Sequence, residues 1–328
     1  MIGQPRPLVF WRGFWNSSSG PIYLMLVVIF AVTWFLVGEN GGQFLTVPNI
    51  TDILTRSVAL GLVAVGQTIV ILSGSLDLSV AFLVSVSAVT ASVFMQGDPG
   101  RIPGGVAVCL AIGLLVGLAN GFVITKLQVN PFIATLGMSL ILNGVIYTAV
   151  NNFSGAVPNE FQVLAYGDLG PIPIPIVLLA VVVLGAWFML TFTRFGHHLY
   201  AVGGSQVTAR LSGVRSDRVI IAAHVLCSLA AVLTGLFLAS RLRAGAPWVG
   251  TDGAYDLESI AAVVLGGTAL TGGKGGVLGT IAGVFILSII DIAFNDLQVN
   301  PFLHSVVRGV IIIAAVASYA LRSARAHA

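Results

Sequence analysis

The sequence predicts an all-α, polytopic membrane protein with about ten transmembrane helices arranged as an inverted five-helix repeat. Its composition is the first observation, because 8% of the 328 residues are charged and 57% are apolar. A soluble domain has about 25% charged residues. Such a chain cannot cover a surface in water, so a lipid bilayer is its expected solvent. The 39 glycines fit membrane helices that pack closely.

The second observation is a series of apolar segments, since about 20 apolar residues are needed to cross a bilayer. The first segment follows Arg6 and Arg12 and has no small-x-small cleavage site, so we expect a retained helix rather than a signal peptide. The eighth and ninth are short and interrupted by glycine, which is typical of tilted, broken or re-entrant helices. The expected spans are 22–38, 53–73, 77–96, 104–125, 131–150, 173–193, 218–240, 256–271, 276–293 and 303–321.

A repeated hexapeptide is the third observation. Leu-Gln-Val-Asn-Pro-Phe occurs at 127–132 and again at 297–302, before the fifth and the tenth expected spans. An odd number of spans separates the two copies, so they lie on opposite faces of the membrane. This predicts an inverted duplication, a common plan of transporters, although Asn-Pro is also a frequent helix start by itself.

Cations set the expected orientation. With the N-terminus inside, the inner side holds Arg6, Arg12, Lys126, Arg194, Arg210, Arg215, Arg218, Lys274, Arg322 and Arg325, and the outer side holds Arg56, Arg101, Arg241 and Arg243. Both termini are then cytoplasmic, with a segment over 1–21, a membrane domain over 22–321 and a tail over 322–328. The loop 194–218 is cytoplasmic and 151–172 is the longest external loop.

The sequence contains no recognisable catalytic, phosphate-binding or metal-binding motif. Residues 268–275 (TALTGGKG) fail as a phosphate-binding loop, because Thr268 and Gly275 replace the required glycine and hydroxyl residue. There is no H-E-x-x-H or G-x-S-x-G motif, and the histidines lack metal-ligand spacing. Cys109 and Cys227 lie in apolar runs, as core residues do. The net charge of +3 is too small and scattered for nucleic-acid binding.

Six polar residues in or at the ends of the expected spans are candidates for a polar path. Asp77 either caps the third helix or acts in gating, and capping explains at least one of Asp256 and Glu258 at the eighth. The mid-span amides either line the path or join helices. We read His224 as a hydrogen-bonded core histidine, and Arg308 as a partner for Asp291 or Asp296. The six candidates are Gln67, Asp77, Asn120, Asn143, Asp256 and Glu258.

The basic loop 194–218 stands out between two apolar runs. It carries four arginines and two histidines against one acid, Asp217. A membrane protein with such a loop presents it to a cytoplasmic partner; the alternative is a solvated positive-inside loop.

Four segments resemble those of the sugar-type ABC importer permeases, a family typified by the ribose permease. The loop segments 194–204 and 209–214 are similar to the family's cytoplasmic coupling loop, and 256–275 is similar to its second signature. Further similarity lies at 74–79 and 131–137, so the resemblance runs from about Pro48 to Tyr319. The chain departs from the family at Ser75, Ser205 and Thr208, and in the order of its carboxylates at 256 and 258.

The resemblance implies a permease subunit of an ATP-driven importer in the bacterial inner membrane, carrying a pentose, hexose or related polyol-like solute. It implies three protein partners: a second permease chain, identical or paralogous; a periplasmic or lipid-anchored sugar-binding protein; and a cytoplasmic double-cassette ATPase, which binds ATP and Mg²⁺ in place of this chain. A short helix over 206–211 would sit in a cleft of the ATPase, with Arg210 as a polar contact. The coupling residues are Arg194, Gly196, Tyr200, Gly203, Gly204, Ala209, Arg210, Ser212 and Gly213.

Three rival functions remain open on the sequence. A secondary solute carrier would share the inverted repeat but transport without an ATPase. A passive channel needs a selectivity constriction, and a membrane-embedded enzyme needs a nucleophile or metal cluster; the sequence shows neither.

Overall fold

The computed structural model describes residues 20–39 and 44–300, together with 303, 306, 307, 309, 310 and 313. Within this part, seven helices are long and apolar enough to cross a membrane, which confirms an all-α, polytopic membrane protein. They are α2 (Gly20–Glu39), α3 (Val47–Leu72), α5 (Ile102–Lys126, after the 3-10 turn Pro99–Arg101), α6 (Pro131–Ala149), α8 (Ile174–Phe192), α11 (Ser216–Leu242) and α14 (Val277–Asp296).

Shorter elements connect these helices. They are α4 (Val80–Met95), α7 (Asn159–Tyr166), α9 (Arg194–Gly204), α10 (Gln206–Leu211), α12 (Val249–Asp252), α13 (Tyr255–Leu265) and an antiparallel hairpin of β1 (Asp168–Leu169) and β2 (Ile172–Pro173). The tenth expected span, 303–321, falls largely outside the described residues, as do 1–19, 322–328 and Arg308. The count of ten helices and the inverted repeat therefore stay predictions.

The eighth expected span, 256–271, is interrupted, as its glycines indicated, and its helix ends earlier than the expected bound. Helix α13 ends at Leu265 after 11 residues, and the chain continues as a glycine-rich loop over 266–276. Gly267, Gly272 and Gly273 take positive φ values of 82°, 85° and 72°, a left-handed backbone that ends a helix. The ninth segment, in contrast, forms the 20-residue α14.

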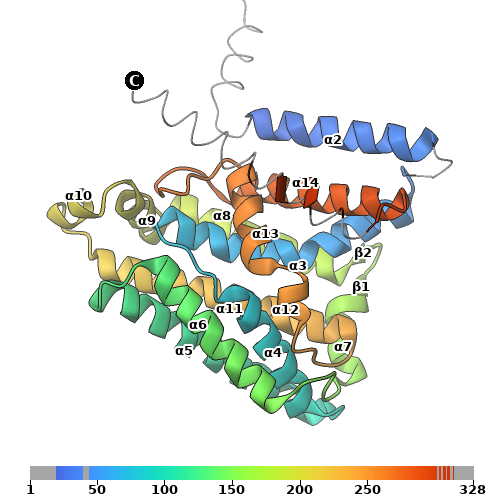
Figure 1. The fold of residues 1–328 in the computed structure, drawn as a ribbon, viewed down its shortest axis with the longest axis horizontal. Coiled ribbons are helices and arrows are strands. Elements are labelled where there is room, and N and C mark those ends of the chain that lie inside the picture. The colour runs from blue at the N-terminus through green and yellow to red at the C-terminus, as the bar shows by residue number, and fades with distance from the viewer. Residues whose placement is uncertain are drawn as a thin grey trace, which may run out of the picture.

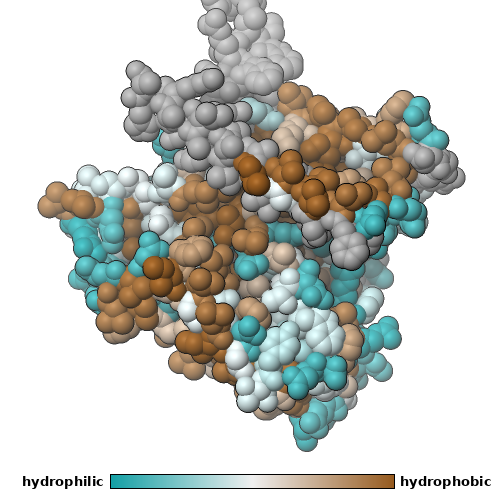
Figure 2. Space-filling view, viewed as in Figure 1, coloured by the Kyte–Doolittle hydropathy of each residue, from teal (hydrophilic) through white to brown (hydrophobic). Residues whose placement is uncertain are grey.

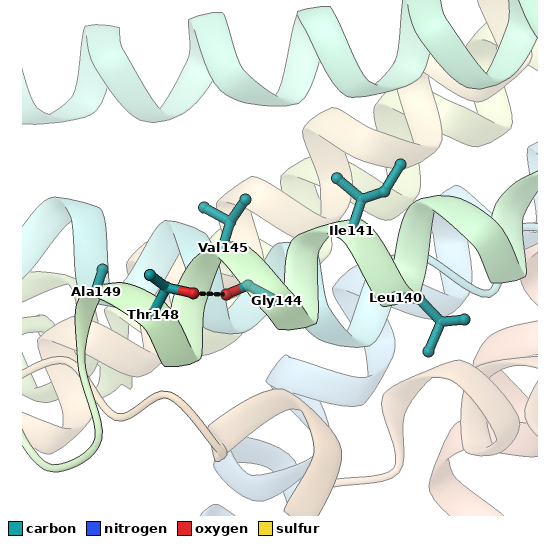
Figure 3. A pocket seen from close by; sticks show the side chains of 6 residues that line it. All are labelled: Leu140, Ile141, Gly144, Val145, Thr148 and Ala149. Atoms are coloured by element: carbon teal, nitrogen blue, oxygen red, sulfur yellow. Dashed lines mark hydrogen bonds between the residues drawn. The ribbon is translucent and has the colours of Figure 1, made fainter.

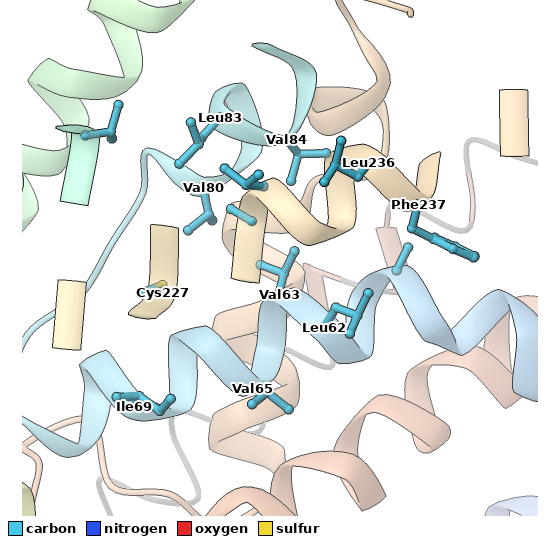
Figure 4. Close-up of a cluster of buried hydrophobic side chains, with 14 of the residues drawn as sticks. Leu62, Val63, Val65, Ile69, Val80, Leu83, Val84, Cys227, Leu236 and Phe237 are labelled. Carbon is cyan, nitrogen blue, oxygen red and sulfur yellow. The ribbon is translucent and has the colours of Figure 1, made fainter. Parts of the chain in front are cut away.

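Helix α11 lies at the centre of the helix packing and contacts α3, α4 and α5. Figure 4 shows its Cys227, Leu236 and Phe237 among buried side chains of α3 and α4. Its contact with α5 is closer, because Gly113, Gly117 and Gly121 recur every fourth residue there. A Cβ atom at Gly117 or Gly121 would come within 2.6 Å of a Cα atom of α11, so glycine is required for this approach.

Four of the shorter elements lie at two opposite ends of the molecule. Figure 1 shows α9 and α10 at one end, and α7 with the β hairpin at the opposite end. Helices α2, α6 and α8 expose most of their apolar side chains, and Figure 2 shows hydrophobic surface over α2, α14 and α6. Exposed apolar helix faces of this kind fit contact with lipid.

Candidate coupling surface and buried polar cluster

The basic loop folds into the two short helices α9 and α10. Thr193 begins α9 by accepting a hydrogen bond from the Gly196 amide at 3.3 Å, and Ser205 begins α10 by accepting from the Thr208 amide at 3.2 Å. Both are preferred N-cap residues. Helix α10 has the bounds expected for the short helix at 206–211, so that prediction is confirmed.

Helix α10 carries apolar side chains on its exposed face. Val207 is 71% exposed and Leu211 is 85% exposed, while Ala209 is buried and anchors the helix. Figure 2 shows this hydrophobic patch at the tip where Figure 1 labels α10. An amphipathic helix that exposes apolar side chains in this way suits a groove on a partner protein.

Arg210 is held by a neighbouring carboxylate. Its Nη2 atom donates to Asp217 Oδ1 at 2.6 Å, and Lys126 Nζ donates to Asp217 Oδ2 at 2.6 Å. Asp217 lies in the first turn of α11 and Lys126 ends α5, so the two ion pairs fasten α10 to both helices. The Arg210 side chain is 49% exposed.

Three backbone segments meet where α9 ends. We name Gly74, Gly203, Gly204, Gly272 and Gly273 the glycine junction. A Cβ atom at Gly272 would come within 2.7 Å of the Gly74 nitrogen, and one at Gly273 within 2.6 Å of the Gly204 nitrogen. The end of α3, the end of α9 and the loop over 266–276 are therefore in direct backbone contact.

Two hydrogen bonds fix the glycine junction. The Gly273 amide donates to the Leu72 carbonyl at 3.0 Å, and the Tyr200 hydroxyl donates to the Gly275 carbonyl at 2.9 Å. Burial raises the pKa of the Tyr200 phenol, so this donor keeps its proton across the physiological range. Nothing in the sequence pattern signals that these segments meet.

The other expected coupling residues lie at the ends of the two helices. Arg194 is the first residue of α9, and Gly196 lies against the backbone of Leu190, where α8 turns into α9. Ser212 follows α10 and donates its amide to the Thr208 carbonyl at 3.0 Å. Gly213 has a φ of +85°, which glycine adopts without strain.

Next to the glycine junction, five buried polar residues form what we name the Asp77 cluster: Ser75, Asp77, Ser79, Asn120 and His224. Asp77 is completely buried. Its carboxylate accepts from the Ser79 amide at 2.9 Å and from Asn120 Nδ2 at 3.4 Å, and His224 Nδ1 lies 3.3 Å from its Oδ2. The other ring nitrogen of His224 lies 2.8 Å from Ser75 Oγ. The cluster thus joins the α3–α4 loop to α5 and α11.

The cluster corrects one prediction and completes another. Asp77 is not the N-cap residue of the third expected helix, because α4 begins at Val80 with Ser79 as its N-cap residue; the Asp77 carboxylate nevertheless accepts from the Ser79 amide at the start of α4. His224 is a hydrogen-bonded core histidine, as expected. The contact between His224 and Asp77 was not predicted, since 147 residues separate them. One signal could have indicated it: a carboxylate and an imidazole that both lie in apolar runs each require a buried hydrogen-bond partner.

The remaining path candidates are dispersed. Gln67 is buried on α3, and its Oε1 accepts a long, 3.5 Å contact from the Cys227 thiol, one helical turn from His224. Asn143 is half-buried on α6. Asp256 accepts from the neighbouring Leu257 amide at 2.9 Å; it lies inside the first turn of α13, whose N-cap residue is Ala254.

Glu258 lines a polar cavity of 310 Å³ between α3, α13 and α14, together with Arg56, Asp252, Asp291 and other residues. It too lies in the first turn of α13 rather than at its cap. Of the six candidates, Asp77 and Asn120 are thus in direct contact, while Glu258 lies on a separate cavity.

A second cavity, a shallow depression of 530 Å³ on α6, is apolar. Figure 3 shows its lining by one helix: Leu140, Ile141, Gly144, Val145, Thr148 and Ala149. The only hydroxyl of this set, on Thr148, donates to the Gly144 carbonyl at 2.6 Å. The depression therefore fits lipid or another apolar surface rather than a hydrophilic solute. In the described part of the chain, no group of three or more His, Cys, Asp or Glu residues is placed to hold a metal ion.

The described chain has membrane-length helices, two short helices with N-cap residues at one end, and a buried polar cluster. This combination fits a transport permease. The family model described as "Branched-chain amino acid transport system / permease component" matches residues 49–316, and the chain belongs to this family. It is 35% identical over 307 residues to the ribose import permease protein RbsC of Escherichia coli (strain K12), covering 92% of this chain and 93% of that protein.

Two further relatives extend the comparison. The chain is 38% identical over 309 residues to the ribose import permease protein RbsC of Bacillus subtilis (strain 168), covering 92% of each. It is 28% identical over 363 residues to the xylose transport system permease protein XylH of Escherichia coli (strain K12), again covering 92% of each. The resemblance to sugar importer permeases of the ribose type is confirmed. No solved structure matches the chain.

Proposed function

We propose that this chain is the membrane-spanning subunit of an ATP-driven importer that carries a monosaccharide, or a related polyol-like solute, across the bacterial inner membrane. The ribose and xylose permeases support this solute class, because each is similar over 92% of this chain. The family description names branched-chain amino acids, whereas these individual relatives are named for ribose and xylose.

The observation that carries the proposal is the exposed face of α10. Val207 and Leu211 are 71% and 85% exposed on a helix that is braced to α5 and α11 through Asp217. An exposed apolar helix face that is held in place before binding loses little conformational entropy when it binds, and it suits a cleft in a second protein. We assign that protein as a cytoplasmic ATPase with two nucleotide-binding cassettes, which would bind ATP and Mg²⁺.

The working cycle then needs two packed arrangements of the helices, biased by the partners. Closure of the ATPase on ATP would push α9 and α10, and a periplasmic or lipid-anchored sugar-binding protein would dock at the opposite end, near α7. Two permease chains, identical or paralogous, would enclose the path. Both termini would be cytoplasmic, as the cations indicate.

Co-purification tests the assembly. The permease is tagged, extracted from its native membrane in mild detergent, and the proteins that accompany it are identified and quantified by mass spectrometry. We expect a stoichiometric double-cassette ATPase, and a paralogous permease if the dimer is mixed. A chain that purifies without an ATPase, and moves solute in liposomes along an ion gradient, would establish a secondary carrier instead.

Uptake tests the solute. The permease, its ATPase and its binding protein are reconstituted in liposomes, and accumulation of radiolabelled D-ribose, D-xylose and D-glucose is measured with ATP inside. We expect ATP-dependent accumulation of at least one sugar, abolished when the binding protein is omitted. Accumulation of leucine without any sugar would refute the proposed solute class.

A further inference from the structure

A basic pocket of 280 Å³ lies where α5 ends, α11 begins and α10 packs against both. Its lining is Lys126, Arg210, Val214, Arg215, Ser216, Asp217 and Arg218. Four cations thus surround one carboxylate. Lys126 and Arg210 each donate to a different oxygen of that carboxylate, so Asp217 balances part of their charge.

Arg215 and Arg218 leave the pocket positively charged. Within the described residues, neither has a carboxylate at ion-pair distance, and both are exposed. They flank the N-terminus of the 27-residue α11, whose N-cap residue makes no side-chain capping bond. The helix dipole adds positive potential at the same point, and this combination favours an anion.

Ser216 supplies an independent observation. Its side chain is only 2% exposed, and its buried Oγ atom has no hydrogen-bond partner in the part of the chain that the structure describes. A buried hydroxyl without a partner costs free energy, so native proteins satisfy such groups with a ligand or a water. Ser216 is also a lining residue of the pocket, as are Arg215 and Arg218.

The surroundings of the pocket are apolar on the side of α5. Leu115, Leu118 and Phe122 are 66%, 42% and 53% exposed and precede Lys126 by eleven, eight and four residues, so they lie on its side of the helix. Lys126 ends a helix long enough to span a membrane. An apolar stripe that leads up to a cationic pocket matches the two parts of a phospholipid, its acyl chain and its phosphate.

We propose that this pocket is a binding site for a phosphate group, held by Arg215, Arg218 and the Ser216 hydroxyl at the N-terminus of α11. The apolar stripe on α5 favours an anionic phospholipid as the source of the phosphate, with free phosphate as the soluble alternative. The site is distinct from the exposed face of α10 and from the Asp77 cluster. The inference does not rest on the proposed solute or on the ATPase.

Ligand binding to the whole permease tests the site. The protein is purified in neutral detergent, stripped of lipid, and titrated separately with phosphatidylglycerol, phosphatidylcholine and inorganic phosphate, with the midpoint of thermal unfolding as readout. The test variant is Arg215→Gln with Arg218→Gln. Its matched control is Arg101→Gln with Arg241→Gln, which removes the same charge at the opposite ends of α5 and α11. A single Ser216→Ala variant probes the hydroxyl while leaving every charge in place.

We expect phosphatidylglycerol, but not phosphatidylcholine, to raise the unfolding midpoint of the native protein and of the control. The double arginine variant should bind it at least tenfold more weakly, since charge-assisted hydrogen bonds are lost, and Ser216→Ala should weaken it severalfold. Stabilisation by inorganic phosphate at equal concentration would identify the soluble source. Equal affinities of the arginine variant and the control for both phosphatidylglycerol and phosphate would overturn the proposal.

Discussion

Asp77 and His224 form a buried pair that connects the α3–α4 loop to α11. Both side chains have zero exposed area, and burying a polar group without a hydrogen-bond partner is expensive. Ser79, Asn120 and Ser75 supply hydrogen bonds around the pair, so the polar atoms are largely satisfied inside an apolar bundle. If one of these side chains is removed, its former partners lose a hydrogen bond that no surrounding water can replace.

His224→Ala should therefore destabilise the permease by about 1–3 kcal/mol or more, the usual cost of leaving buried hydrogen-bonding groups without a partner. The midpoint of thermal unfolding in detergent measures the loss. Ser228→Ala is the control, because this buried hydroxyl on the same helix makes no hydrogen bond within the described residues and its removal should cost under about 1 kcal/mol. Equal losses for the two variants would contradict a special role for the pair.

At the scale of elements, composition and apolar run length sufficed to predict the bounds of the long helices to within six residues. Two details could not be predicted, for different physical reasons. The end of α13 at Leu265 lies before the expected bound, because the positive φ angles at Gly267 and Gly272 depend on backbone contacts that hydropathy does not register. The partners of Asp77 were missed because local spacing reveals neighbours along the chain, whereas Asn120 and His224 lie on other helices.

The glycine junction offers a sharp comparison between two adjacent residues at the end of α9. A Cβ atom at Gly203 would collide with the Leu72 carbonyl and the Gly273 amide, whereas one at Gly204 meets nothing within 4 Å. Gly203→Ala should lower the free energy of unfolding by about 1–3 kcal/mol through overpacking, and Gly204→Ala should change it by less than about 1 kcal/mol. Chemical denaturation of both variants checks this, and similar values would argue against the close backbone contact.

The surface of α10 makes a separate prediction. Leu211→Asp should weaken association with the ATPase by about 30-fold or more, as loss of an interface hot spot does, without changing the unfolding midpoint, since this side chain is 85% exposed. Leu169→Asp is the matched control, because Leu169 is 64% exposed at the opposite end. Arg210→Glu is a less selective probe, because it also breaks the ion pair with Asp217. Unimpaired ATPase binding by Leu211→Asp would exclude α10 from the interface.

At the scale of the whole molecule, the first four residues of the two hexapeptide copies, 127–130 and 297–300, share two features of their backbone. Each follows a long helix, α5 or α14, and each places its glutamine in the left-handed region, with φ of 54° at Gln128 and 53° at Gln298. The first copy follows Lys126, which pairs with Asp217 near α10. The second copy follows Asn295, which lines the same cavity as Arg56 at the other end of the molecule. This supports the inverted plan, which stays a prediction for the two halves as wholes.

Labelling of single cysteines tests the orientation of these ends. The native Cys109 and Cys227 are buried and free, so they give a low background. In intact cells, a membrane-impermeant maleimide should label Asn152→Cys, and should reach Ser212→Cys only after the membrane is permeabilised. Both positions are exposed. The reverse pattern would place the N-terminus outside.

The segment from Ser73 to Ser79 belongs to both internal assemblies, since Gly74 lies in the glycine junction and Ser75 binds His224. Gly74 contacts Gly203 at the end of α9 through backbone atoms alone. Three residues later the same segment carries Asp77, which lies 3.3 Å from His224 of α11. A displacement of α9 would therefore have a path of only three peptide bonds to the buried Asp77 cluster.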